Sequence, residues 1–143
     1  MDQFDFHKNS NPLSPPPTGS IPVIQRLILI YKMWQEFLPH FPKRSKYTLG
    51  NKIDSLFIEN LELIFIALYL PRDHKLPYIK KSIGKLDLLK FFLQISWEIN
   101  SLENNKYIAI SEPINEVGKM LGGWYKQVEK QTQPQSDKKG AGK

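Results

Sequence analysis

The side chains in this sequence with the clearest chemical potential are basic. Lysine and arginine total 20 against 14 aspartates and glutamates, which gives a formal net charge of +6. Residues 21–130 hold 16 of the basic and 11 of the acidic side chains, so most of the surplus lies in the central part of the chain. Such a surplus is compatible with binding a polyanion such as nucleic acid. Charge that only confers solubility explains it equally well when taken alone.

Two groups of basic residues lie at predicted breaks between helices. The first group is Lys43, Arg44 and Lys46, and the second is Arg72, His74 and Lys75. In an antiparallel bundle these two breaks fall at opposite ends. A single continuous basic surface is therefore not expected from these two groups.

Three further lysines lie on one predicted helix. Lys81 and Lys85 are four residues apart and share a face, where a solvated charged surface explains them. Lys90 instead falls within an apolar stripe, where a lysine must extend to water, pair with an acid or face a cavity. We expect either a pair with an acid such as Glu62 or a place in a wet, basic channel formed by an oligomer.

Residues for catalysis or metal binding are scarce. The chain has no cysteine, which removes thiolate nucleophiles, disulfides and thiolate metal sites. Its three histidines lie in different segments, and it has no Glu-x-x-His pair of the kind that binds iron in helical bundles. It also has no glycine-rich phosphate loop. We therefore predict no catalytic residue, no metal site and no cofactor.

The elements that position the basic residues are predicted to be four amphipathic helices. Apolar residues recur at steps of three and four, and no segment shows the alternation typical of a strand. The predicted fold is all-α, an antiparallel up-down-up-down four-helix bundle over 21–130. The four helices are predicted over 21–38, 45–70, 77–102 and 104–130.

The flanks of the predicted bundle differ from it in composition. Residues 1–20 are rich in proline, serine and asparagine, and 131–143 are polar with glycine and lysine, so we predict a disordered leader and a disordered basic tail. The sequence shows no signal peptide and no apolar run long enough to span a membrane. We expect a cytoplasmic protein without a membrane partner.

Two features exceed the needs of a lone bundle. The third predicted helix has a core side with Ile79, Ile83, Leu86, Leu93 and Trp97 and a nearly opposite apolar side with Leu88, Phe92, Ile95, Ile99 and Leu102. A second subunit would bury the extra side, and a central helix in a compact monomer is the alternative. Gly118 and Gly122 lie on one face of the fourth helix, where they favour close approach of another backbone over a tolerated kink.

Three stretches give the chain a family resemblance. They are FPKRSKYTLGNKID at 41–54, KLDLLKFFLQ at 85–94 and EVGKMLGGWYK at 116–126. They resemble the accessory variability proteins (Avd) of diversity-generating retroelements. That family lies within a superfamily of small bacterial four-helix-bundle proteins, some encoded in intervening sequences of ribosomal RNA genes. The resemblance covers roughly residues 21–128 and includes the helix breaks.

The resemblance implies more than the spacing does. Avd proteins are four-helix protomers that form a basic, barrel-shaped homopentamer without catalytic activity. They bind nucleic acid and associate with the retroelement reverse transcriptase, and they support mutagenic cDNA synthesis from a template RNA. At position 94 this chain has Gln94, where relatives often carry a second basic residue. The basic residues here that match the family pattern are Lys43, Lys46, Lys85, Lys90 and Lys119.

The predicted function is therefore a non-catalytic accessory subunit of a reverse transcriptase. Its expected partners are the reverse transcriptase, a template RNA or RNA/DNA hybrid, and further copies of itself. The alternative is a four-helix scaffold of the same superfamily that binds only proteins. The predicted nucleic-acid-binding residues are Lys43, Arg44, Lys46, Lys81, Lys85, Lys90 and Lys119. The predicted oligomer interface consists of Leu88, Phe92, Ile95, Ile99, Gly118 and Gly122.

Overall fold

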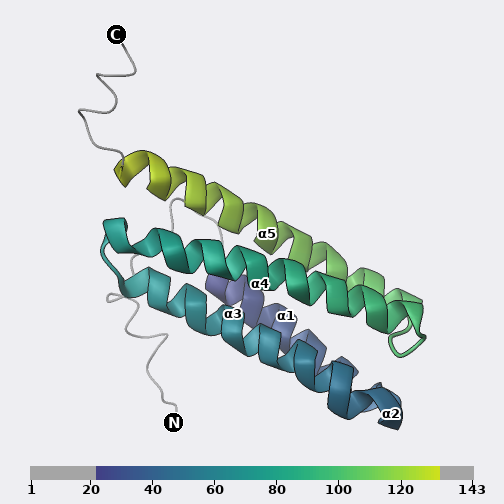
Figure 1. The fold of residues 1–143 in the computed structure, drawn as a ribbon. Coiled ribbons are helices and arrows are strands. Elements are labelled where there is room, and N and C mark those ends of the chain that lie inside the picture. Colours follow the sequence, from purple (N-terminus) through teal and green to yellow (C-terminus); the bar gives the residue numbers. More distant parts are fainter. Residues whose placement is uncertain (1–21, 133–143) are drawn as a thin grey trace.

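The computed structural model describes residues 22–132, and this part of the chain is helical without a strand (Figure 1). Each long helix packs against two others, so that α1, α3, α4 and α5 form a closed four-helix bundle. The predicted all-α bundle is confirmed. The long helices are α1 (Val23–Phe37), α3 (Asn51–Tyr69), α4 (Arg72–Glu98) and α5 (Asn104–Thr132). Short turns η1 (Leu38–His40), α2 (Lys43–Ser45) and η2 (Lys46–Gly50) connect α1 to α3.

The helices differ in length, which makes the two ends of the bundle unlike. At 1.5 Å per residue the 15 residues of α1 span about 22 Å and the 29 residues of α5 about 43 Å. At the α3–α4 turn the core consists of Ala67, Ile79 and Val128, which come from α3, α4 and α5. At the other end α1 completes the core.

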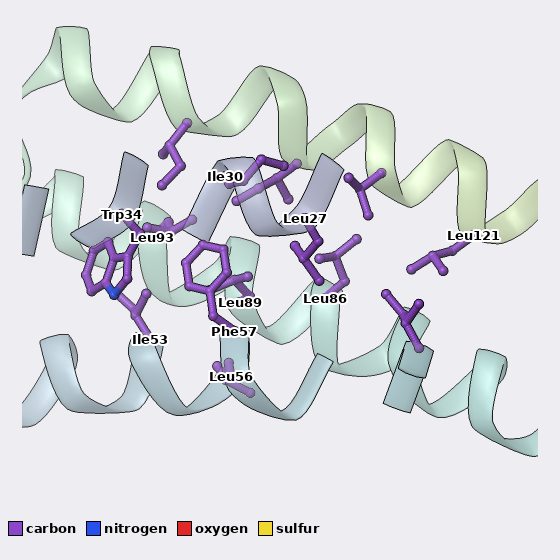
Figure 2. Close-up of a cluster of buried hydrophobic side chains, with 14 of the residues drawn as sticks. Leu27, Ile30, Trp34, Ile53, Leu56, Phe57, Leu86, Leu89, Leu93 and Leu121 are labelled. Atoms are coloured by element: carbon purple, nitrogen blue, oxygen red, sulfur yellow. The ribbon is translucent and has the colours of Figure 1, made fainter. Parts of the chain in front are cut away.

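The main core is built around Trp34 (Figure 2). Its indole is fully buried, stacks on Phe57 with centroids 6.0 Å apart and meets Phe41 edge-on at 5.4 Å. Its Nε1 donates a hydrogen bond of 3.1 Å to Asp54 Oδ1, so the polar atom of this large apolar group is satisfied. Leu27, Ile53, Leu56, Leu86, Leu89 and Leu93 surround these rings.

Two buried polar pairs tie the helices together. Ser82 Oγ donates to Asn60 Oδ1 over 2.8 Å, and the amide nitrogen of Asn60 donates to the carbonyl of Leu56. Ser45 Oγ and Ser101 Oγ lie 2.7 Å apart and link α2 to the α4–α5 connection. Because an unpaired buried hydroxyl is costly, both pairs favour this one arrangement of helices.

The predicted start of the third helix was wrong. Residues 71–76 were expected to form a loop, but α4 begins at Arg72 directly after Pro71, and Pro77 lies inside it. A proline at the sixth helical position removes one backbone hydrogen bond, which a helix of 27 residues tolerates. The group Arg72, His74 and Lys75 therefore lies in the first turn of α4 and not in a loop.

The predicted end of this helix at Leu102 was also wrong. Asn100 has φ 65°, the left-handed conformation that ends many helices, and asparagine adopts it more readily than most residues. The N–H of Ser101 then bonds to the carbonyl of Ser96 at 2.8 Å, and the N–H of Asn100 to that of Trp97 at 3.0 Å. Leu102, expected on the outer side, consequently turns into the core.

The predicted leader and nearly all of the predicted tail lie outside the described residues. Within them, Gln131 and Thr132 continue α5.

Candidate nucleic-acid interface

The densest basic segment connects α1 to α3. Residues 37–53 contain four lysine and arginine residues and no acidic one. Lys43, Arg44 and Lys52 are exposed, and Lys46 is half-buried. We call this surface, formed by Lys43, Arg44, Lys46, Tyr47 and Lys52, the basic end. Among the described residues none of its four cations forms a salt bridge.

A π-helical turn orients the basic end. Lys46 precedes the buried Ile53 by seven residues, so on an uninterrupted α-helix it would lie on the core face. The π turn over Lys46–Gly50 adds about one residue to the helix and rotates the preceding residues by about 100°. Ser45 then takes the inward position and bonds to Ser101, while Lys46 moves to the edge and Tyr47 to the outside.

Gly50 lets this turn pack closely against the rest of the protein. A Cβ atom at this position would lie 2.9 Å from Cδ1 of Leu38, so even the smallest side chain forces a shift. The glycine matters here for close packing against the end of the Leu38 side chain, since its backbone conformation is ordinary for a helix. Together with the Ser45–Ser101 hydrogen bond, this contact fixes the basic end on the bundle.

The carboxylate nearest in sequence to the basic end is engaged elsewhere. Asp54 Oδ1 accepts hydrogen bonds from Trp34 Nε1 and from Gln35 Nε2 at 3.0 Å. Burial raises the pKa of Tyr31, and its interaction with Asp54 raises this pKa further. Asp54 is therefore hydrogen-bonded to side chains of α1 and does not neutralise the basic end.

Lys81 and Lys85 lie on the flank of α4 that faces α3. Lys85 Nζ is 3.1 Å from Glu59 Oε1 of α3, and Lys81 is exposed one turn earlier. As predicted, these two lysines share a face. Because Lys85 forms a salt bridge with Glu59, this flank offers less free positive charge than the basic end.

Lys90 lies on the opposite flank of α4, where it meets α5. Its Nζ is 3.8 Å from Asp87 Oδ1 and its side chain is 37% exposed, so the acid beside it is Asp87 of its own helix and not Glu62, the example considered from the sequence. A Cβ at Gly118 would lie 3.4 Å from Lys90 Nζ and 3.9 Å from its Cε, so the end of the lysine side chain passes close to Gly118 of α5. The end of the lysine side chain therefore packs over α5 and remains partly exposed beside Asp87. Lys119 is exposed beside Gly118.

The basic group at the other end of the bundle is used differently. Lys75 Nζ donates hydrogen bonds to the carbonyl oxygens of Ala67 and Leu68 and lies 6.0 Å from the Trp124 ring centroid. Burial lowers the pKa of Lys75. This lysine caps the C-terminus of α3, where a cation is favoured by the helix dipole. The prediction that the two basic groups lie at opposite ends is confirmed.

The predicted interface residues on α4 lie mostly at the surface. Leu88 and Ile99 are exposed, and Phe92 and Ile95 are half-buried. Sequence inspection missed Phe91, which is 53% exposed on the same outer side. It also assigned Trp97 to the core side, whereas Trp97 is exposed, stacks on Tyr107 and donates to Asn104. A Cβ at Gly122 would meet nothing within 4 Å, so Gly122 faces open space in the protomer.

The structure thus separates the seven predicted nucleic-acid-binding residues into three places. The basic end holds three of them, the α3-facing flank of α4 holds two, and the α4–α5 surface holds Lys90 and Lys119. Sequence inspection did not include Tyr47 and Lys52 in the site. Lys52 could have been found from its place in the acid-free stretch, whereas the π turn that exposes Tyr47 has no clear sequence signal.

The described residues contain no group of three histidine, aspartate or glutamate side chains that could hold a metal ion. Within 22–132, no helix is both long and apolar enough to cross a membrane.

Comparison with known proteins adds one match. The sequence model of the bAvd-like family matches residues 23–128, a span that runs from the first residue of α1 to the last turns of α5. No curated protein matches the chain.

Proposed function

Because this chain belongs to the bAvd-like family, we propose that it is a non-catalytic accessory subunit of a diversity-generating retroelement. In this role it binds the template RNA, or an RNA/DNA hybrid, and associates with the retroelement reverse transcriptase in the cytoplasm. It thereby supports mutagenic cDNA synthesis. Family membership supports the accessory role, and the surface charge supports the nucleic-acid partner.

The observation that carries the RNA-binding part is the basic end. Its four cations lie within ten residues of one another and have no carboxylate partner among the described residues. Lysine and arginine bind phosphates and release condensed counterions, which gives affinity without sequence readout. A surface of unpaired cations that is fixed on the bundle suits this type of binding.

A titration of RNA at several salt concentrations tests this proposal. The logarithm of affinity should fall linearly with the logarithm of salt, with a slope that reports the number of neutralised phosphates. Replacing Lys43, Arg44 and Lys46 by glutamine should flatten the slope. A matched control replaces the exposed Lys32, Lys126 and Lys130 by glutamine, which removes the same net charge elsewhere.

Equal losses in the two triple variants would show that only net charge matters and that the basic end is no site. A wild-type protein that does not bind RNA even at low salt would overturn the RNA-binding role itself. Co-purification with the reverse transcriptase of the same retroelement tests the other half of the proposal.

Self-assembly into a ring, expected as a homopentamer from the family resemblance, belongs to the same proposal. The outer side of α4 supports it, because Leu88, Phe91 and Ile99 are large, apolar and exposed in the protomer. A second copy that covers this side would bury apolar surface that otherwise faces water.

Light scattering of Ile99→Glu tests the assembly. The side chain is 43% exposed, so the protomer should tolerate glutamate, whereas burial of an unpaired charge between subunits costs several kcal/mol. We expect a helical species of lower mass. Leu29→Glu, on the exposed outer side of α1, is the matched control and should leave the mass unchanged. A wild-type monomer at micromolar concentration would contradict the assembly.

The same exposed apolar side chains favour a second candidate, a scaffold that binds only proteins. Salt-sensitive RNA binding separates the two candidates, since a scaffold of this kind requires no RNA affinity.

A further inference from the structure

Tyr47 is the most exposed large apolar side chain of the described residues. Its relative exposure is 64%, and the Nζ of Lys46 lies 5.8 Å from its ring centroid. A tyrosine this exposed gains little free energy from burial, so packing within the protomer does not account for its ring. In the sequence, Tyr47 lies between Lys43, Arg44 and Lys46 on one side and Lys52 on the other, with no acidic residue in the surrounding stretch 37–53.

The π turn is what places the ring there. The same rotation that turns Ser45 inward to Ser101 brings Tyr47 to the outside, one turn beyond Lys43. The close approach of Leu38 to Gly50 and the buried serine pair hold this turn in place. The turn that carries the ring is therefore already ordered, so little conformational entropy is lost when a ligand binds to the ring.

From this geometry we infer that Tyr47 is a stacking platform for an unpaired base of single-stranded RNA. Phosphates on either side of that base bind Lys43, Arg44 and Lys52. The inference rests on the proposed function and adds to it the form of RNA that the basic end selects. A duplex is excluded as the preferred ligand because its bases already stack on each other, whereas single strands offer free faces to aromatic side chains.

Paired titrations test this inference. An unstructured RNA of about 12 nucleotides and a duplex of the same length are titrated against the wild type and variants by fluorescence anisotropy. Tyr47→Leu should weaken binding of the single strand about tenfold and leave binding of the duplex within a factor of two. The salt slope should stay the same, since no phosphate contact is lost. Tyr47→Phe keeps the aromatic ring and should bind like the wild type.

Tyr69→Leu is the matched control. Tyr69 is also an exposed tyrosine near a basic group, but it lies at the other end of the bundle with its ring 4.8 Å from that of Phe65. Its loss should leave both affinities unchanged. In addition, 2-aminopurine placed in turn along the single strand should be quenched at one or two positions when the wild type binds, a readout that does not depend on any variant.

The outcomes separate this inference from the proposed function. Salt-dependent RNA binding that Tyr47→Leu leaves intact, or reduces equally for both RNAs, overturns the stacking site and leaves the RNA-binding role standing. Absence of 2-aminopurine quenching at every position also overturns it. Absence of binding of either RNA to the wild type overturns both.

Discussion

The two ends of the bundle carry basic groups of similar size but use them in different ways. At the α3–α4 turn, Lys75 is bound to the last carbonyl oxygens of α3 and its pKa is lowered by burial. At the basic end, Lys43 and Arg44 have no such engagement and lie in water. Positive charge in the sequence is therefore a poor guide to positive charge that a ligand can reach.

The cause lies in the two connections. Only Leu70 and Pro71 separate α3 from α4, so the end of α3 needs a cation from the neighbouring helix to satisfy its carbonyls. The connection from α1 to α3 runs through η1, α2 and η2, which satisfy much of their own backbone. Several of their side chains, including Lys43, Arg44 and Tyr47, are consequently free to face outward.

Replacement of the buried Trp34 and of the partly buried Trp124 should show the largest difference between the ends. Trp34→Ala removes a fully buried indole, its two ring contacts and its hydrogen bond to Asp54, and should lower the free energy of unfolding by about 3–5 kcal/mol. Trp124 belongs to α5 and packs against the small core at the α3–α4 turn. Trp124→Ala should lower the free energy of unfolding by only about 2 kcal/mol because this indole is partly buried. Urea unfolding followed by circular dichroism measures both. Equal losses would contradict the expectation that the core completed by α1 contributes more to stability than the small core at the α3–α4 turn.

Substitutions of two glycines, Gly50 and Gly122, test the comparison between the two ends with smaller expected changes in stability. Gly50→Val should cost about 1–3 kcal/mol, since even its Cβ would lie 2.9 Å from Leu38 Cδ1. Gly122→Ala, toward the other end, meets nothing within 4 Å and should stabilise the protein by up to about 1 kcal/mol through helix propensity. Thermal unfolding measures both shifts. If Gly122→Ala lowers the mass of the assembly, the open space at Gly122 is filled by another subunit.

The sequence predicted the parts of this fold that depend on periodicity. The apolar stripe of α5, with Ile110, Ile114, Val117 and Leu121, lies in the core as its spacing predicts. The ends of α4 could not be predicted, because Pro77 is tolerated inside a long helix and Asn100 ends it by a backbone conformation that has only a weak sequence preference. Helix ends depend on such local choices more than on burial.

Within the candidate site, the grouping of Lys43, Arg44 and Lys46 could be predicted from their proximity in the chain. The pairing of Lys85 with Glu59 could not, since it depends on the rotation of α4 against α3. The exposure of Tyr47 depends on the π turn, and Lys90 packs beside Gly118 of another helix. Regular helical spacing within one element specifies neither a local π turn nor the contacts between elements.

The smallest effect expected concerns the pH dependence of Lys75. Its pKa in the folded protein lies below the ordinary value of 10.5 because burial disfavours the ammonium. Between the lowered pKa and 10.5 the unfolded chain binds more protons at this position than the folded one, so this group makes the free energy of unfolding rise with pH. Lys75→Met removes the titration and keeps the apolar stem beside Trp124.

The free energy of unfolding of the wild type minus that of Lys75→Met should therefore increase as pH is raised toward 10.5, while titrations shared by both proteins cancel. Denaturant unfolding at several pH values below 10.5 measures this difference. A difference that falls with pH would mean that attraction between the ammonium and the carbonyl oxygens of Ala67 and Leu68 outweighs its desolvation. Lys75 would then be held at the end of α3 mainly by electrostatic attraction to these carbonyl oxygens, an interaction that Lys43 and Arg44 at the basic end lack.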